Sequence, residues 1–475
     1  MKGHADITAK LFLKEKEIIM SNLSAGFSRI DITPMRGIGI SGYYISRLAE
    51  GVLDNLYARA LALSYGEKRM VILGLDILQI QTPVCNRLRE EVATATGLPM
   101  DAIFIHCTHT HTGPYVDTIL AQNAGLELDV EPVEEYQRFL SHRLADVACE
   151  ALEDLSPARM GFAIGHASNV AYIRRFRMKD GSVRTNPGVN NPDILAPIGE
   201  LDERVSVLRF DREGKKSITL MNYANHPDVV GGNKISADWP GLSCVALEKA
   251  IDTTEAIFIN GMQGDVNHVN VHPTKGFLND LFMDFDDVAR GYGHAKYMAR
   301  VMAGAVMQVW DKVEYVDVDG IDFINRTVNI PSNKPAPEEM PEARRINDLH
   351  TAGRDAELPY EGMMLTTVVA DAARKVRLEN APDFFPMIFS ALRIGNVALI
   401  GVPGEPFNGI GRALKKAEGW DLVIPCCLTN GSEGYFPMED AYAEGGYEAK
   451  SSNFKAGVAE KIIAEGHDIL AGFRK

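Results

Sequence analysis

Short apolar segments rich in β-branched residues alternate with segments of helical periodicity through most of the chain. Segments 69–78 (RMVILGLDIL) and 102–111 (AIFIHCTHTH) have the continuous apolar character of buried strands. Between them, segment 83–97 predicts a helix that ends at Gly97. A strand, a helix and a second strand in this order are typical of an α/β fold.

The same alternation continues toward the end of the chain. It predicts further strands at 205–210, 217–224, 256–260, 387–406 (two strands joined at 394–396) and 422–428, and helices at about 241–251, 293–310 and 450–473. The Pro- and Glu-rich segment 331–345 predicts a surface excursion into an exposed helix, and the acidic segment 124–137 predicts a loop over a site. Neither resembles a linker, so we expect one large unit over 21–475, with a mixed β-sheet core flanked by helices.

Composition and charge narrow the choice of partners. The 475 residues are 46% hydrophobic and 24% charged, which is ordinary for a soluble globular protein. A net charge of -15 argues against nucleic acid, because phosphate binding needs clustered Lys and Arg. We therefore expect a small-molecule partner, and nothing in the pattern sets the oligomeric state.

The chain ends and the cysteines bear on location. No segment approaches the ~20 apolar residues of a membrane span, and residues 1–20 contain no signal-peptide core. Six scattered cysteines are typical of a reduced compartment, so we expect a cytoplasmic protein. Because Met20 directly precedes SNLSAGFSRIDITP, we expect residues 1–20 to be an extension that is not the native start.

The segment FIHCTHTHTGP (104–114) carries three histidines. In an extended strand, His109 and His111 share one face and His106 points to the other. The pair stands at the carboxyl end of the strand, where open α/β sheets bind their ligands. Neutral imidazole suits zinc, but two hydrogen-bonded core histidines would give the same pattern. We interpret His106 as structural.

Other strand ends deliver further metal-competent residues. His226 follows a strand in MNYANHPDVVGG, FINGMQGDVNHVN opens from a strand into a polar loop, and Glu405 lies just past a strand in GVPGEPF. A loop histidine alone means little. Several strands that each end in such residues favour a metal site, most simply zinc, with a position open to water.

Competing motifs are weaker. GIGISG (37–42) matches a dinucleotide-binding pattern, but it follows DITPMR where an apolar strand is required, and no helix opens after it. The chain contains neither a GxSxG nucleophile elbow nor an HExxH zinc-protease motif.

These segments resemble the catalytic domain of the neutral/alkaline, non-lysosomal ceramidases. Members of that family carry a THTHSGP-like segment, here 108–114, and the resemblance extends from about Gly26 through GFSRIDITP, NYANHP, NGMQGDVN, VPGEP and GYFPMEDAYAEGGYE in the same order. The resemblance implies one zinc ion per chain held by His109, His226, Glu405 and Tyr435. Tyr435 comes only from the resemblance, since 15 tyrosines offer no basis for choosing one.

The resemblance also implies catalytic roles. His111 would contact the substrate or the ligand shell, and His111 or Tyr435 would polarise the carbonyl or carry the proton to the leaving amine. Arg174 in AYIRRF would stabilise charge, with Arg175 as the alternative. Where ceramidases continue the Gly-Asp loop with Ser-Pro-Asn, this chain has Asn267 and His268. Asn267 can donate a hydrogen bond to an oxyanion but cannot act as a nucleophile.

We therefore expect a zinc-dependent hydrolase that cleaves the amide bond of a small or lipid-like N-acyl compound. We expect no counterpart of the C-terminal β-sandwich domain of the ceramidases, and on that expectation membrane ceramide is a doubtful substrate. Two alternatives stay open: a hydrolase of a soluble amide or ester, and a catalytically silent metal-dependent binding protein. The sequence also leaves open whether Ca²⁺ or Mg²⁺ accompanies zinc.

Overall fold

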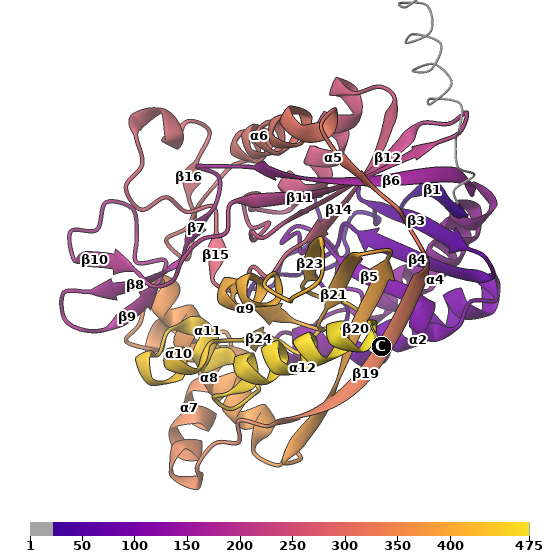
Figure 1. Cartoon of the computed structure of the whole chain (residues 1–475). Helices are drawn as coiled ribbons and strands as arrows, with labels where there is room; N and C mark the ends of the chain where they lie inside the picture. Colours follow the sequence, from indigo (N-terminus) through magenta and orange to yellow (C-terminus); the bar gives the residue numbers. More distant parts are fainter. Residues whose placement is uncertain (1–21, 475) are drawn as a thin grey trace, which may run out of the picture.

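A long, curved sheet organises the chain (Figure 1). The structure, a computed structural model, describes residues 22–474, so the expected extension 1–20 lies outside the described residues. The strands of this sheet lie in the order β14 (Thr254–Asn260), β12 (Ser217–Tyr223), β11 (Arg204–Arg212), β6 (Ser156–His166), β1 (Leu23–Asp31), β3 (Tyr57–Tyr65), β4 (Lys68–Leu75) and β5 (Ile103–Cys107), and β18 (Glu314–Val316) also pairs with β6. The two outermost pairs are parallel and the inner pairs antiparallel, so the sheet is mixed, as expected.

A second sheet lies against the first. Its strands are β19 (Ile321–Pro331), β20 (Phe384–Ile394), β21 (Val397–Gly401) and β23 (Leu422–Cys426). Leu399 and Ile424 of this sheet share one buried cluster with Leu73 and Ile105 of the long sheet. The main core is therefore the apolar layer between the two sheets.

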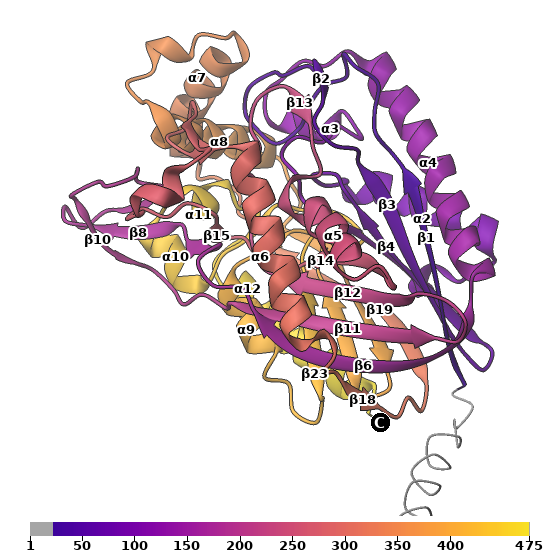
Figure 2. The ribbon, with the colours of Figure 1, turned by 90° about the horizontal axis from the view of Figure 1, so that it is seen from above.

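Helices cover the outer faces (Figure 2). They are α2 (Thr82–Thr96) and α4 (Val130–Glu153) beside β1 to β5, α5 (Asp238–Ala250) and α6 (Tyr292–Trp310) beside β6 to β14, and α9 (Asn408–Leu414) and α12 (Val458–Gly472) on the second sheet. The predicted helix before Gly97 is confirmed. Gly97 ends it with φ 69°, a left-handed conformation that glycine adopts without steric cost. Within residues 22–474, no helix is both long and apolar enough to cross a membrane.

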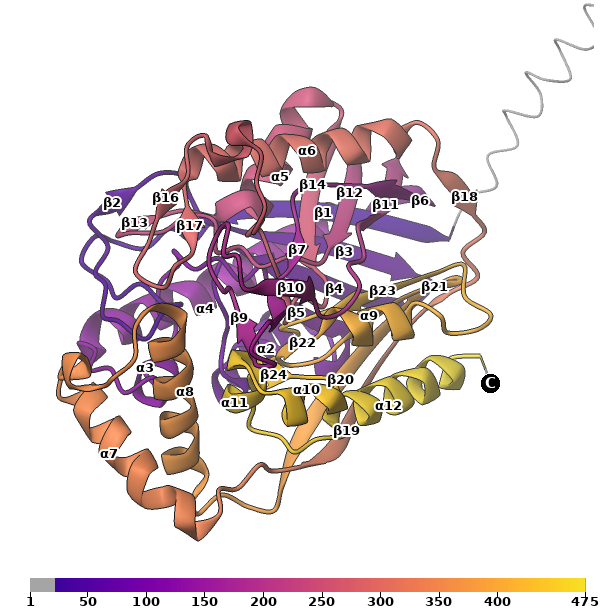
Figure 3. The same cartoon turned by 90° about the vertical axis from the view of Figure 1, so that its left-hand side faces the viewer.

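The remaining strands are short, and two of the remaining helices, α7 and α8, are longer (Figure 3). These elements are β2 (Gly51–Val52), β7 (Tyr172–Ile173), β8 (Arg175–Met178), β9 (Val183–Thr185), β10 (Ile194–Pro197), β13 (Lys234–Ile235), β15 (Val266–Asn267), β16 (Phe282–Met283), β17 (Ala289–Arg290), β22 (Glu405–Pro406), β24 (Tyr435–Phe436), α3 (Ile119–Asn123), α7 (Met340–Thr351), α8 (Gly362–Leu378), α10 (Glu439–Glu444) and α11 (Tyr447–Ser451). The exposed helix expected after the Pro- and Glu-rich segment is α7.

Three expected boundaries are wrong. Segment 124–137 is a loop only as far as Asp129, whose side chain caps α4. The helix expected over 450–473 is split into α11 and α12, and Gly457 adopts φ 94° before the second part. The strand expected over 102–111 ends at Cys107.

The early end of this strand overturns the argument from alternating faces. His109 has φ 79°, a left-handed conformation that a non-glycine residue rarely adopts, so the backbone turns there. His109 and His111 still come together, as a result of the turn and not of strand alternation.

Asp238 fixes the loop that follows His226. Its buried carboxylate accepts the backbone N–H groups of Val229 and Val230, at 2.9 Å each, and that of Trp239, at 2.6 Å. The Trp239 indole N–H in turn donates to the His226 carbonyl. Burial outweighs the N–H donors and raises the pKa of Asp238 to about 7.

We predict that Asp238 makes folding pH-dependent. Its proton is lost at about pH 4 in the unfolded chain but only at about 7 in the folded one, so its contribution to stability falls as pH rises between these values. The shift of roughly three units corresponds to on the order of 4 kcal/mol. Urea denaturation from pH 4 to 7.5 should show a falling stability of the wild type relative to Asp238→Asn. A constant difference between the two, equal to that for the exposed Asp193→Asn, would contradict this.

Candidate metal centre

The ends of three strands bring together the residues expected to bind metal. His109 lies two residues beyond β5, His226 three residues beyond β12, and Glu405 opens β22 just after β21. Strand β22 pairs in parallel with β24, and this pairing sets Glu405 beside Tyr435. The expectation that the site lies at the carboxyl ends of strands is confirmed.

Glu405 is the centre of the cluster. Its Oε2 atom lies 3.1 Å from Nε2 of His109 and 3.1 Å from Nε2 of His226. The Tyr435 hydroxyl lies 3.4 Å from the same nitrogen of His226. All four residues are buried. The structure therefore brings together the complete set of ligands that the resemblance implies.

The hydrogen bonds of the two histidines show what the cluster lacks. Nδ1 of His109 lies 3.0 Å from the Leu78 carbonyl, and Nδ1 of His226 lies 2.9 Å from the Gln263 carbonyl. A carbonyl only accepts, so each Nδ1 carries a proton and each ring turns its Nε2 atom toward Glu405. The buried Oε2 atom of Glu405 has no hydrogen-bond partner among residues 22–474. A cation is the group that satisfies such an arrangement.

The spacing of these atoms suits zinc. Ligands about 2.0–2.1 Å from a tetrahedral zinc ion lie roughly 3.3 Å from one another. The observed separations of 3.1 to 3.4 Å match this value. A set of nitrogen and oxygen donors is also what zinc accepts.

His111 lies directly beside the cluster. Its Nε2 atom is 3.3 Å from Nε2 of His109, and nitrogen atoms of His109, His111 and His226 all lie within 4.8 Å of one another. The geometry therefore adds His111 to the groups that could hold an ion, a role that the sequence analysis gave to other residues.

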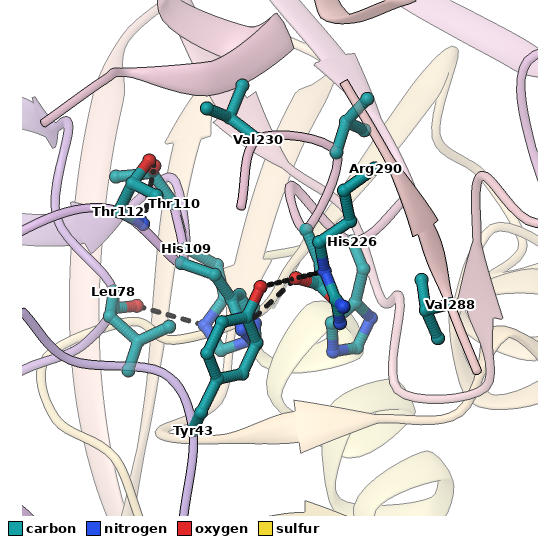
Figure 4. A network of polar contacts seen from close by, with 12 residues as sticks. Tyr43, Leu78, His109, Thr110, Thr112, His226, Val230, Val288 and Arg290 are labelled. Atoms are coloured by element: carbon teal, nitrogen blue, oxygen red, sulfur yellow. Dashed lines mark hydrogen bonds and ion pairs between the residues drawn. The ribbon is translucent and has the colours of Figure 1, made fainter. Parts of the chain in front are cut away.

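Threonine side chains hold the turn that carries His109 and His111 (Figure 4). The hydroxyls of Thr110 and Thr112 both donate to the Ser236 carbonyl, at 2.7 and 3.1 Å. The N–H of His109 donates to the Ile77 carbonyl. A left-handed non-glycine residue costs about 1–3 kcal/mol, so these bonds are what keep His109 in its conformation.

Burial and neighbouring charges shift the pKa values of the ionisable side chains in the cluster. Burial alone would raise the pKa of Glu405, but the adjacent His109 and His226 outweigh it and hold this pKa well below its usual range. Burial, with Arg174 close by, lowers the pKa of His226 to about 4. Burial and the charge of Glu405 raise the pKa of Tyr435 well above 10. Tyr435 is thus a neutral phenol unless a cation helps to remove its proton.

Arg174 and Arg175 diverge. The Arg174 guanidinium donates to the Tyr435 hydroxyl at 3.1 Å and pairs with Glu448 at 2.7 Å. Arg175 turns to Glu444 and the Gly445 carbonyl. Of the two, only Arg174 reaches the cluster.

Asn267 does not reach the cluster. Its amide group donates to Asn186 at 2.9 Å, and its carbonyl oxygen accepts the N–H of Val269. Both ends of the side chain are engaged, so nothing in this placement supports the expected contact with an oxyanion. His106 is structural, as expected: Nδ1 faces the Cys427 carbonyl, and Nε2 accepts the N–H of Asn260.

A charged network behind His111 was missed by the sequence analysis. Asp228 lies 3.7 Å from Nδ1 of His111, pairs with Arg290 at 2.7 Å and accepts a hydrogen bond from Tyr43 (Figure 4). Asp228 stands two positions after His226, which is the one signal that the sequence offered. Arg290 comes from a different part of the chain and gave none.

The cluster lines a cavity of about 490 Å³. Its wall includes His109, His111, Glu405 and Tyr435, with apolar side chains such as Leu120 and Phe385. This volume lies in the range of pockets that hold small organic ligands.

We predict that one zinc ion binds per chain and that Glu405 is needed for it. Glu405→Ala removes the oxygen that lies between the two histidines, so zinc content after dialysis should fall at least about tenfold. Plasma mass spectrometry measures it directly. The matched control is Glu433→Ala, a carboxylate of the same cavity that should keep its zinc. Equal zinc contents in the two variants would contradict the assignment.

Comparisons with known proteins agree on the architecture. No family model and no curated protein sequence matches this chain. Among solved structures, it is similar to neutral ceramidase from Pseudomonas aeruginosa, with a TM-score of 0.71, 18% identity, and coverage of 95% of this chain and 74% of that one. It is equally similar to a ceramidase complexed with C2, with a TM-score of 0.70, 17% identity, and coverage of 95% and 75%. The chain therefore has the fold of the neutral ceramidases.

Proposed function

We propose that the protein is a zinc-dependent amidase that hydrolyses the C–N bond of an N-acyl compound. The observation that carries the proposal is the convergence of Nε2 of His109 and Nε2 of His226 on Oε2 of Glu405, at 3.1 Å each. His109 and Glu405 also line a cavity of small-molecule size. The fold of the neutral ceramidases supports it.

The ion would be held by His109, His226, Glu405 and Tyr435. When bound, zinc would polarise the substrate carbonyl and lower the pKa of water toward ~7. The carbonyls of Leu78 and Gln263 accept from Nδ1 of the two histidines, which turns both Nε2 atoms toward the position of the ion. Glu405 supplies a negative charge at the same point.

Arg174 serves the oxygen side of the reaction. Its guanidinium is buried and stays charged, because the adjacent Tyr435 and Glu448 raise its pKa against the effect of burial. It donates to the Tyr435 hydroxyl, so it stabilises negative charge on that oxygen and on a substrate oxygen beside it. Tyr435 would then both ligate the ion and orient the carbonyl.

His111 serves the proton side. It lines the cavity, its Nε2 atom faces the cluster, and Asp228 stands behind Nδ1. In this position it can accept a proton from the attacking water and deliver it to the nitrogen as the C–N bond breaks. Hydrolysis then yields a carboxylic acid and an amine.

A panel of N-acyl compounds tests the activity. We expect the zinc-loaded protein to hydrolyse at least one N-acyl amide, with release of amine measured by fluorescence, and Glu405→Ala to abolish it. Short and long acyl chains in the panel separate a soluble metabolite from a lipid. A zinc-loaded protein that binds these compounds without cleaving any of them would overturn the amidase proposal in favour of a binding protein.

The role of His111 has its own test. His111→Ala should lower kcat by about 10²-fold or more, because a general acid–base group contributes on that scale, while zinc content stays near one per chain. Turnover and metal content are measured on the same preparation. If zinc content falls in step with kcat, His111 is a ligand and the proton-transfer role is wrong.

A further inference from the structure

Arg377 stands on the wall of the cavity near the end of α8. This helix packs against α11 and approaches α3, and all three helices contribute residues to the cavity wall. The Arg377 guanidinium donates to the Asn453 side chain at 2.7 Å and, at 3.5 Å, to the carbonyl of Asn123. Arginine has five N–H donors, so most of them are left for another group.

The charge of Arg377 has no carboxylate to balance it. Within residues 22–474, no Asp or Glu oxygen lies within 4 Å of its guanidinium. We call His109, His226, Glu405 and Tyr435 together the donor cluster. The arginines nearer to it have carboxylate partners, unlike Arg377: Arg174 pairs with Glu448, and Arg290 pairs with Asp228 and Asp286. Arg377 is exposed, so water solvates part of its charge, and it presents to the cavity a guanidinium that has no ion-pair partner.

Arg377 and the donor cluster line the same cavity. Tyr44, His109 and Glu405 belong to the same cavity wall as Arg377. A molecule that fills a cavity of about 490 Å³ can therefore contact Arg377 and the donor cluster together.

The surface next to Arg377 is apolar. Leu378, Ala381, Pro382 and Phe385 continue the same wall. A ligand that fits it combines an anionic end with a hydrocarbon part. The planar fork of arginine matches the two oxygens of a carboxylate, which it binds with two parallel hydrogen bonds.

We propose that the cavity takes amides that carry a carboxylate, and that Arg377 binds this carboxylate while the amide carbonyl lies at the donor cluster. That the ligand is an amide rests on the proposed amidase function. That it carries a carboxylate is inferred from Arg377 alone. It gives the substrate an anionic end where a ceramide has a neutral one, and it makes Arg377 the residue that determines specificity.

A pair of ketones tests the binding step without turnover. In 4-oxononanoic acid a methylene group replaces the amide nitrogen of N-hexanoylglycine, so the probe cannot be cleaved, and 4-oxononanamide is its neutral counterpart. Calorimetry on the zinc-loaded protein should give a Kd about tenfold or more lower for the acid than for the amide. Arg377→Met keeps the apolar stem and should remove this preference. Arg344→Ala, an exposed arginine of α7 that pairs with Glu379, is the matched control and should retain it.

Two outcomes would overturn the proposal. Equal affinity of the wild type for acid and amide overturns it. An acid preference that survives in Arg377→Met also overturns it, because the carboxylate is then held by the zinc ion alone. If Arg377→Met loses its folded circular dichroism spectrum, Arg377→Lys, which keeps the charge but not the planar fork, takes its place and should show a weakened preference.

Turnover separates this inference from the proposed function. N-Hexanoylglycine carries the carboxylate on the amine side and N-pentylsuccinamic acid carries it on the acyl side, so their kcat/KM values identify which side faces Arg377. Cleavage of neutral amides with no acid preference in binding leaves the amidase proposal standing and removes the carboxylate. An Arg377-dependent acid preference without cleavage of any amide leaves carboxylate binding standing and removes the amidase proposal.

Discussion

The contact of two imidazole nitrogens with a buried carboxylate is the constraint on which the rest of the site depends. Backbone carbonyls accept from Nδ1 of His109 and His226, and both Nε2 atoms lie 3.1 Å from Oε2 of Glu405, which has no hydrogen-bond partner among residues 22–474. A buried acceptor without a donor is costly, and a bound cation removes that cost. A chain that folds this way is organised for a cation.

The fold meets this constraint by bringing strand ends together. β5 and β12 lie far apart in the order of the long sheet, and β21 belongs to the second sheet, yet their carboxyl ends converge because the sheets curve around one shared apolar core. The left-handed turn at His109 and the threonine bonds to Ser236 complete the approach. The packing that forms the core therefore also sets the positions of the residues at the site.

The sequence predicted the parts of this design that local pattern encodes. Apolar runs located most strands, and polar residues at their ends pointed to His109, His226 and Glu405. Tyr435 required the resemblance, because nothing local distinguishes it from the other tyrosines among the 15 in the chain. The turn at His109 was missed because its cause is hydrogen bonding to Ile77 and Ser236, which are distant or unremarkable in sequence. Arg377 and Arg290 gain their meaning only from what surrounds them in the folded chain.

Anomalous diffraction from crystals of the zinc-loaded protein, recorded on both sides of the zinc absorption edge, tests the central claim most directly. The account predicts one strong difference peak per chain, about 2 Å from Nε2 of His109, Nε2 of His226 and Oε2 of Glu405. A map with no peak at this position, or with its zinc peak elsewhere in the molecule, would contradict it and leave the cluster as a set of buried core side chains.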